Sequence, residues 1–86
     1  MEREIRYRKA YVTMQVNMLP DGRLVPTGII WEDGHLYPVD RVRAVTRAAA
    51  QKVGGCGDRY TLVICGKERY FYNDDGIWFT EIQTIK

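Results

Sequence analysis

The stretch that decides the fold is RYTLVICGKERYFYNDDGIWFTEI, residues 59–82. It contains three short runs rich in β-branched and aromatic residues, which favour strands. Glycine, asparagine and aspartate separate the runs, and these residues favour tight turns. The stretch therefore predicts two consecutive β-hairpins. The predicted strands are 59–65, 68–72 and 77–82, and the predicted turns are 66–67 and 73–76.

The residues before this stretch continue the same pattern. Tyr11–Met18 alternates apolar and polar side chains, which is the period of a half-buried strand. Pro38 predicts that the strand it follows lies at an edge or a bend, because proline lacks the backbone donor that a central strand needs. The other predicted elements are a turn at 20–22, a strand at 24–31, a hairpin turn at 33–34 and a strand beginning at 35–37.

Residues 40–53 fit two structures. Valine and alanine recur there at helical spacing, with Asp40 as a cap and Gly54 as a terminator. Residues 41–47 also alternate charged and apolar side chains, as a strand does. We favour a strand to about Arg47, followed by a loop or a single helical turn through 48–50. One short helix within 40–53 is the alternative.

The chain has 86 residues and a mass of 10.0 kDa, which suits one domain with a small core. We therefore expect a single domain over 1–86, with the charged residues 1–6 as a mobile tail. Strands joined by turns at this spacing are typical of a small antiparallel barrel or roll, here of five or six strands. The fold class is mainly β.

The residue inventory argues against an enzyme. The chain has no serine and a single histidine, His35, so a Ser-His-Asp triad is excluded. His35 has no neighbour at metal-ligand spacing, and we expect no catalytic residue, no metal and no cofactor. No apolar run approaches the roughly 20 residues of a membrane span, and no signal peptide opens the chain. We expect a cytoplasmic protein with no membrane partner.

The cysteines are expected to be free thiols in a reducing compartment. Cys65 follows the apolar run 62–64, which predicts a small buried hydrophobe. Cys56 lies in the glycine loop 54–57, near Arg59, where a lowered pKa is a condition for reactivity. A thiol-dependent activity at Cys56 is a weaker hypothesis. The loop itself resembles no phosphate-binding motif and is expected to be a flexible connection.

Charge is unevenly distributed along the chain. The net charge is +2, yet residues 41–69 carry +5, which suggests an anionic partner. If Phe71 faces the core, Tyr70 and Tyr72 face solvent or a partner, beside basic residues. Aromatic and basic side chains together are typical of nucleic-acid binding surfaces. The candidate binding residues are Arg41, Arg43, Arg47, Arg59, Lys67, Arg69, Tyr70 and Tyr72.

Two hypotheses follow for function. The first is a small non-enzymatic binding module that uses this basic, aromatic surface for nucleic acid. The alternative is a protein-interaction adaptor or a self-associating structural protein, because an edge strand can accept a partner strand. The role of Arg59 depends on whether a carboxylate holds its side chain. Held by Asp40 or Asp58 it is structural, and left free it is a ligand contact.

Three segments carry a family resemblance: residues 30–42 (IWEDGHLYPVDRV), 54–61 (GGCGDRYT) and 78–81 (WFTE). They resemble small proteins of unknown function from Gram-positive bacteria and their mobile elements. Those proteins share a Trp-x-Asp-Gly-x-x-Tyr pattern, a Gly-Gly-x-Gly-x-Arg-Tyr segment and a terminal Trp-Phe. The resemblance covers most of the chain from Tyr11 to Glu81. It implies an SH3-like β-barrel and attaches no activity.

Overall fold

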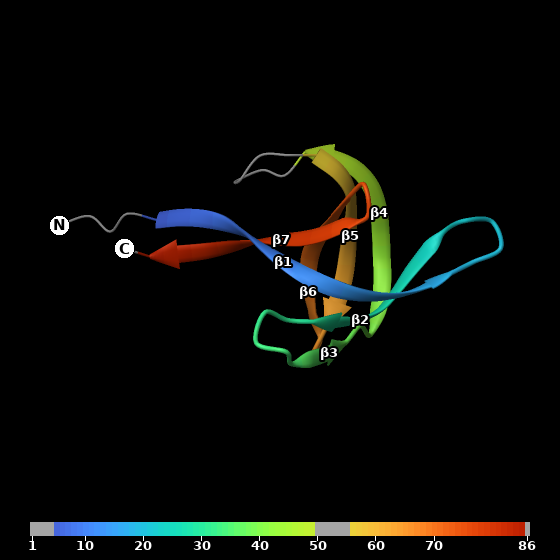
Figure 1. Cartoon of the computed structure of the whole chain (residues 1–86), viewed down its shortest axis with the longest axis horizontal. Coiled ribbons are helices and arrows are strands. Elements are labelled where there is room, and N and C mark those ends of the chain that lie inside the picture. The colour runs from blue at the N-terminus through green and yellow to red at the C-terminus, as the bar shows by residue number, and fades with distance from the viewer. Residues whose placement is uncertain (1–4, 50–55, 86) are drawn as a thin grey trace.

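The computed structural model describes residues 5–49 and 56–85, and these form one curled antiparallel sheet (Figure 1). The order of strands across the sheet is β3-β2-β1-β7-β6-β5-β4. Pro38 lies in β3, at the edge that the sequence predicted for it. The strands are β1 (Ile5–Met18), β2 (Leu24–Ile30), β3 (Leu36–Pro38), β4 (Arg41–Ala49), β5 (Cys56–Ile64), β6 (Lys67–Asp74) and β7 (Ile77–Ile85).

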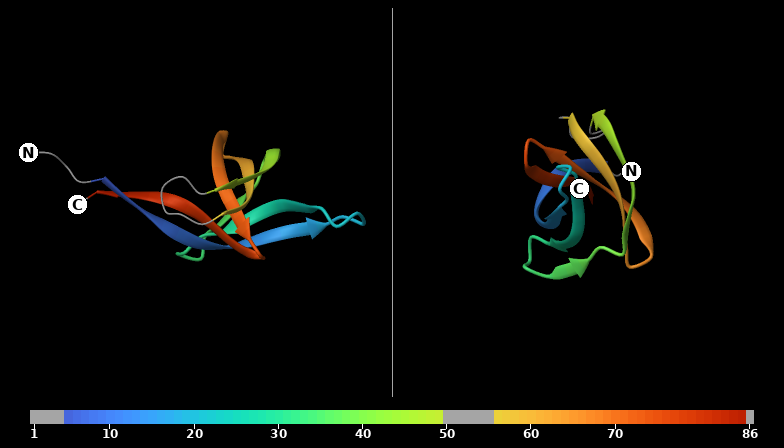
Figure 2. Two further views of the ribbon diagram at one scale, coloured as in Figure 1. Left: turned by 90° about the horizontal axis from the view of Figure 1, so that it is seen from above. Right: turned by 90° about the vertical axis from the view of Figure 1, so that its right-hand side faces the viewer.

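The prediction of a mainly β, antiparallel fold is confirmed, but the predicted number of five or six strands is wrong. The number is seven because β3 and β4 are separate strands at opposite edges of the sheet. β3 pairs with β2, and β4 pairs with β5. The Val39 N–H donates to the Thr27 carbonyl at 3.0 Å, whereas the next N–H, of Asp40, donates to the Val63 carbonyl at 2.8 Å. The chain therefore passes from one edge of the sheet to the other within two residues, which curls the sheet into a half-barrel (Figure 2).

The strand interpretation of residues 41–47 is confirmed, and the strand extends to Ala49. The helical alternative fails for the described part of 40–53, because Arg41–Ala49 forms a strand that pairs with β5 from Arg41–Val63 to Ala49–Cys56; residues 50–53 lie outside the described residues. A β-bulge between Val42 and Ala44 breaks the register once. The bulge leaves Arg43 without an opposite residue and bends the strand.

β1 changes its partner partway along its length. Ile5–Val12 pairs with β7, and Thr13–Met18 pairs with β2. The expected tail over 1–6 is therefore wrong for Ile5 and Arg6, which pair with Ile85 and Thr84; residues 1–4 lie outside the described residues. The two ends of β1 extend away from the body in opposite directions, so that the molecule measures 54 × 26 × 20 Å (Figure 2).

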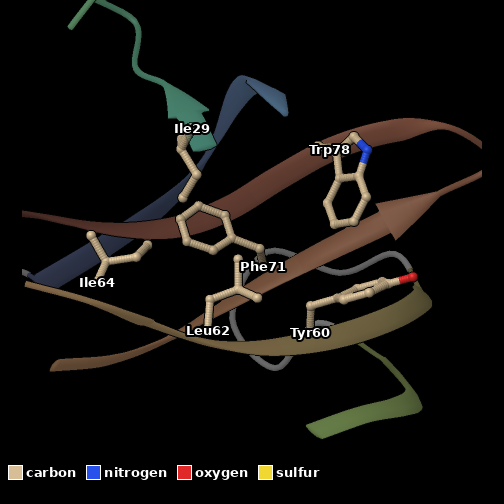
Figure 3. Close-up of a cluster of buried hydrophobic side chains, with 6 residues drawn as sticks. All are labelled: Ile29, Tyr60, Leu62, Ile64, Phe71 and Trp78. Carbon is tan, nitrogen blue, oxygen red and sulfur yellow. The ribbon is translucent and has the colours of Figure 1, made fainter. Parts of the chain in front are cut away.

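The core lies on the concave side of the curled sheet (Figure 3). Tyr60 and Phe71 face each other across β5 and β6, and the Tyr60 ring packs 4.8 Å from the Trp78 ring, centroid to centroid. Leu62 is fully buried, which contributes about 1.5–3 kcal/mol of hydrophobic free energy. The buried cluster consists of Ile29, Tyr60, Leu62, Ile64, Phe71 and Trp78.

Two turns join the strands of the predicted hairpins. In each, a non-glycine residue with positive φ precedes a glycine with positive φ: Cys65-Gly66 and Asp75-Gly76. This is the conformation of a two-residue type I′ turn, which matches the twist of antiparallel strands. The first turn is one residue earlier than predicted. Cys65 is consequently exposed, and the prediction that it is buried is wrong.

Gly57 lies inside β5, opposite Ala48, and not in a flexible loop as the sequence suggested. It is buried, and a Cβ at this position would collide with the Asn73 carbonyl oxygen and approach the Cα of Asp74 at 3.2 Å. Only glycine allows the two backbones to come this close. Cys56 begins the same strand; the surroundings of its side chain, and all of Gly54-Gly55, lie outside the described residues.

We expect Gly57→Ala to lower the free energy of unfolding by about 1–3 kcal/mol, because rigid backbone has to move to admit the methyl group. Gly28→Ala is the matched control. There the added Cβ meets the end of the Gln15 side chain at 2.8 Å, which can rotate away, and we expect a change below about 1 kcal/mol. Urea denaturation of both variants measures the difference. Equal losses would contradict the close approach at Asn73.

Candidate nucleic-acid interface

One row of side chains crosses five strands on the convex face of the sheet, opposite the main buried cluster, and two of its members, Tyr72 and Phe79, form a second buried cluster. Residues paired across antiparallel strands share a face, and four successive pairings define the row. We call it the outer row. It consists of Thr46, Arg59, Tyr72, Phe79 and Tyr11, on β4, β5, β6, β7 and β1 respectively.

Ring contacts hold the outer row together. Tyr72 stacks on Phe79 with centroids 5.1 Å apart and planes 16° from parallel, and both side chains are buried. The Tyr11 ring tilts against Phe79 at 6.3 Å. Tyr11 itself is 57% exposed, so the buried pair supports an accessible ring at the β1 end of the row.

Two cations lie on these rings. The Lys9 ammonium is 4.6 Å from the centroid of Phe79, and the Arg59 guanidinium carbon is 4.6 Å from the centroid of Tyr70. Tyr70 is two residues from Tyr72, so its side chain is on the same face. It is 48% exposed. Cation–π contacts of this kind orient the charges without neutralising them.

Arg59 also takes part in a polar cluster at the middle of the row. The Tyr72 hydroxyl donates to Glu81 Oε1 at 3.3 Å, and the Arg59 side chain lies near enough to that hydroxyl to lower its pKa. The Arg59 Nε is buried without a hydrogen-bond partner. Asp58, one of the two carboxylates considered as its partner, instead forms an ion pair with Arg47 at 3.6 Å. The other, Asp40, accepts the Gly66 N–H.

The eight predicted binding residues divide between two sides of the sheet. Five of them lie on the convex face, as their pairing with Val63, Thr61 and the outer row shows. The other three lie on the core side: Arg47 pairs with Asp58, Lys67 with Ile64 and Arg69 with Leu62. The five on the convex face are Arg41, Arg43, Arg59, Tyr70 and Tyr72.

Two of these residues differ from what the sequence suggested. Tyr72 was expected at the surface, yet it is only 1% exposed because Phe79 packs against it. It supports the row and does not present a free ring. Arg43 forms an ion pair with Glu68, Nε to Oε1 at 3.0 Å, across the neighbouring strand. Its charge is thereby partly compensated.

Sequence reasoning missed Lys9 and Tyr11. Both belong to β1, and they contact Phe79 of the outer row only because β1 pairs with β7, some 70 residues later in the chain. The alternation of Tyr11–Met18 predicted that Tyr11 faces away from the core, but no local pattern indicates which strand it adjoins. The one available signal for a binding role was that Tyr11, an aromatic residue, lies on the polar face of its strand.

The described residues contain no group of three or more side chains suited to hold a metal ion. His35 packs on Tyr37, with ring centroids 4.4 Å apart. In the described part of the chain, no helix has the length and apolar character to cross a membrane. Comparison with protein-family models, curated proteins and solved structures found no match.

Burial raises the pKa of the Tyr72 hydroxyl above its ordinary value of 10.0, and the Glu81 charge raises it further, while Arg59 lowers it. The folded state therefore keeps this proton at a pH where the unfolded chain loses it. Stability from Tyr72 is fully present below about pH 10 and is lost as the pH rises towards the folded-state pKa.

We expect the urea midpoint to fall as the pH is raised above about 10, and to fall less steeply in Tyr72→Phe, which has no hydroxyl to ionise. Part of the slope should remain in the variant, because burial also raises the pKa of Tyr60. Urea titrations of both proteins from neutral to alkaline pH measure the slopes. An identical decline in the two proteins would contradict the assignment to Tyr72.

Proposed function

We propose that the protein is a small non-enzymatic binding module and that its outer row, together with the adjoining Lys9 and Tyr70, binds single-stranded nucleic acid. The observation that carries the proposal is the alignment of two exposed tyrosines, Tyr11 and Tyr70, with two cations, Lys9 and Arg59, along one face. Aromatic rings on a strand face stack on bases, and neighbouring cations contact phosphates.

The energetics suit a modest, sequence-tolerant site. Stacking of a base on an aromatic side chain contributes about 1–3 kcal/mol. The Tyr72–Phe79 stack makes a rigid support under Tyr11, so little side-chain freedom remains to be lost when a base docks. Lys9 and Arg59 are held on rings in the same way, which favours binding by preorganisation.

A single strand fits this row better than a duplex. Stacking on tyrosine requires an accessible base plane, which a single strand offers and an intact duplex does not. Arg41 lies on the same face as the outer row, beyond Arg59, and extends the basic surface towards β4.

Fluorescence anisotropy with a labelled oligothymidine and a labelled duplex tests the proposal. We expect the oligothymidine to bind more tightly at low salt, and Tyr11→Ala and Tyr70→Ala each to weaken it by about tenfold or more. Lys9→Gln should reduce the salt dependence by about 0.7 per lost phosphate contact, the slope typical of single strands.

Arg23→Gln is the matched control for charge. Arg23 pairs with Asp21 beside the β1–β2 turn, and the change removes one positive charge far from the outer row. It should leave affinity and salt dependence close to those of the parent protein. Absence of binding at low salt, or wild-type affinity in both tyrosine variants, would overturn the proposal.

A further inference from the structure

β6 and β7 separate soon after their hairpin turn. They pair through Tyr72, Asn73 and Asp74 of β6, and the register between them ends there. β6 nevertheless begins at Lys67, and β7 continues to Ile85 along β1. The N-terminal half of β6 and the C-terminal half of β7 therefore border an open cleft of about 750 Å³ in the wall of the half-barrel.

Backbone groups of both strands point into this cleft. The two-residue turns make Ile64–Lys67 and Asp74–Ile77 hydrogen-bonded pairs, and such pairs alternate along an antiparallel ladder. The alternation turns the N–H and C=O of Glu68 and Tyr70 away from β5. Along β7 the same alternation, counted from Ile77, turns the N–H and C=O of Gln83 away from β1 and towards β6.

Among the described strand pairings, the backbone N–H and C=O of Glu68 and Gln83 that face the cleft have no strand partner. One contact crosses the cleft near its closed end, where the Thr80 hydroxyl donates to the Tyr70 carbonyl at 2.7 Å. An edge that alternates donors and acceptors at strand spacing is complementary to the backbone of another extended chain. Nucleic acid has no matching pattern.

The cleft has an apolar floor and a basic side. Ile29, Ile64 and Phe71 lie together at the floor, as Figure 3 shows, and Trp31 and Tyr37 complete it. Lys67 and Arg69 line the β6 side of the cleft, where both residues are exposed. The Glu68 carboxylate points to the convex face, where it meets Arg43.

We propose that this cleft binds an extended segment of a partner protein as an added β-strand. Side chains two residues apart share a face of a strand, so Phe71, Arg69 and Lys67 form one series along β6. A guest strand that runs antiparallel to β6 needs an apolar side chain next to Phe71, followed by acidic side chains next to Arg69 and Lys67. The recognised pattern is apolar-x-acidic-x-acidic.

Charge complementarity thus assigns the occupant to a partner and not to a second copy. The pattern apolar-x-acidic-x-acidic occurs nowhere in the 86 residues of this chain. The proposed guest strand contacts side chains on the core side of β6, whereas the outer row lies on the convex face, and Tyr70 borders both. Binding here goes beyond the function proposed above and is measured with a different probe.

The test uses an array of random nonapeptides together with a labelled peptide, TVTVTDTDT, and its basic counterpart, TVTVTKTKT. We expect the array to enrich the apolar-x-acidic-x-acidic pattern and the acidic peptide to bind at least about tenfold more tightly than the basic one. Amide hydrogen exchange of Glu68, Tyr70 and Gln83 should slow when the acidic peptide is added.

Gln83→Pro and Gln83→Ala form a matched pair of variants. Both remove the exposed side chain, but only proline removes the cleft-facing N–H, and that N–H is not used by the β1 ladder. We expect Gln83→Pro to bind the acidic peptide about tenfold more weakly than Gln83→Ala, the loss typical of one hydrogen bond.

A charge exchange keeps the proposal falsifiable if Gln83→Pro does not fold. The double variant Lys67→Glu/Arg69→Glu should lose the acidic peptide and gain the basic one, whereas Arg23→Glu, beside the distant β1–β2 turn, should change neither. Failure of the array and both peptides to bind would overturn the proposal. So would equal binding of the two peptides, or exchange protection confined to β3 or β4.

Discussion

β1 is longer than either of its neighbours and is shared between them. Its first half pairs with β7 and its second half with β2, so the two halves belong to different parts of the sheet. A strand in this position has to coil, and every strand hydrogen-bonded to it follows the same right-handed twist. The chain between β3 and β4 also changes its partner: Val39 donates to Thr27 of β2, and Asp40 donates to Val63 of β5.

Both candidate surfaces follow from this coiling. To stay paired with β1, β7 leaves β6 after three residue pairs, which opens the cleft and exposes backbone groups. The same pairing carries Tyr11 and Lys9 across to Phe79, which completes the outer row. A flat sheet with β6 and β7 paired over their full length would have no cleft.

Local sequence predicted the elements well where turn chemistry decides them. Asp75-Gly76 and the alternation of Tyr70, Phe71 and Tyr72 were sufficient for a hairpin with Phe71 in the core. The burial of Tyr72 was not predictable, because the ring that covers it comes from another strand. Cys65 was predicted to be the last, buried residue of a strand. The turn begins one residue earlier than predicted, so Cys65 lies in the turn and is exposed.

The first residues of β1 show the same limit more strongly. The beginning of the strand, Ile5 and Arg6, falls in the charged segment 1–6 that looks like a solvated tail, and no local pattern indicates a strand there. It becomes a strand because β7 supplies the ladder, and Arg8 gains a bidentate pair with Glu32, at 2.9 and 3.1 Å. Of the candidate site, sequence reasoning therefore found the residues on β4–β6 and missed those on β1.

Tyr70 links the two surfaces physically. Its side chain lies under Arg59 on the convex face, while its backbone groups face the cleft between β6 and β7. A strand added to β6 would restrict the backbone of Tyr70 and, through it, the ring that is proposed to stack on a base. Any effect of one ligand on the affinity for the other is reciprocal by thermodynamic linkage. The two proposed sites would therefore be coupled energetically through Tyr70.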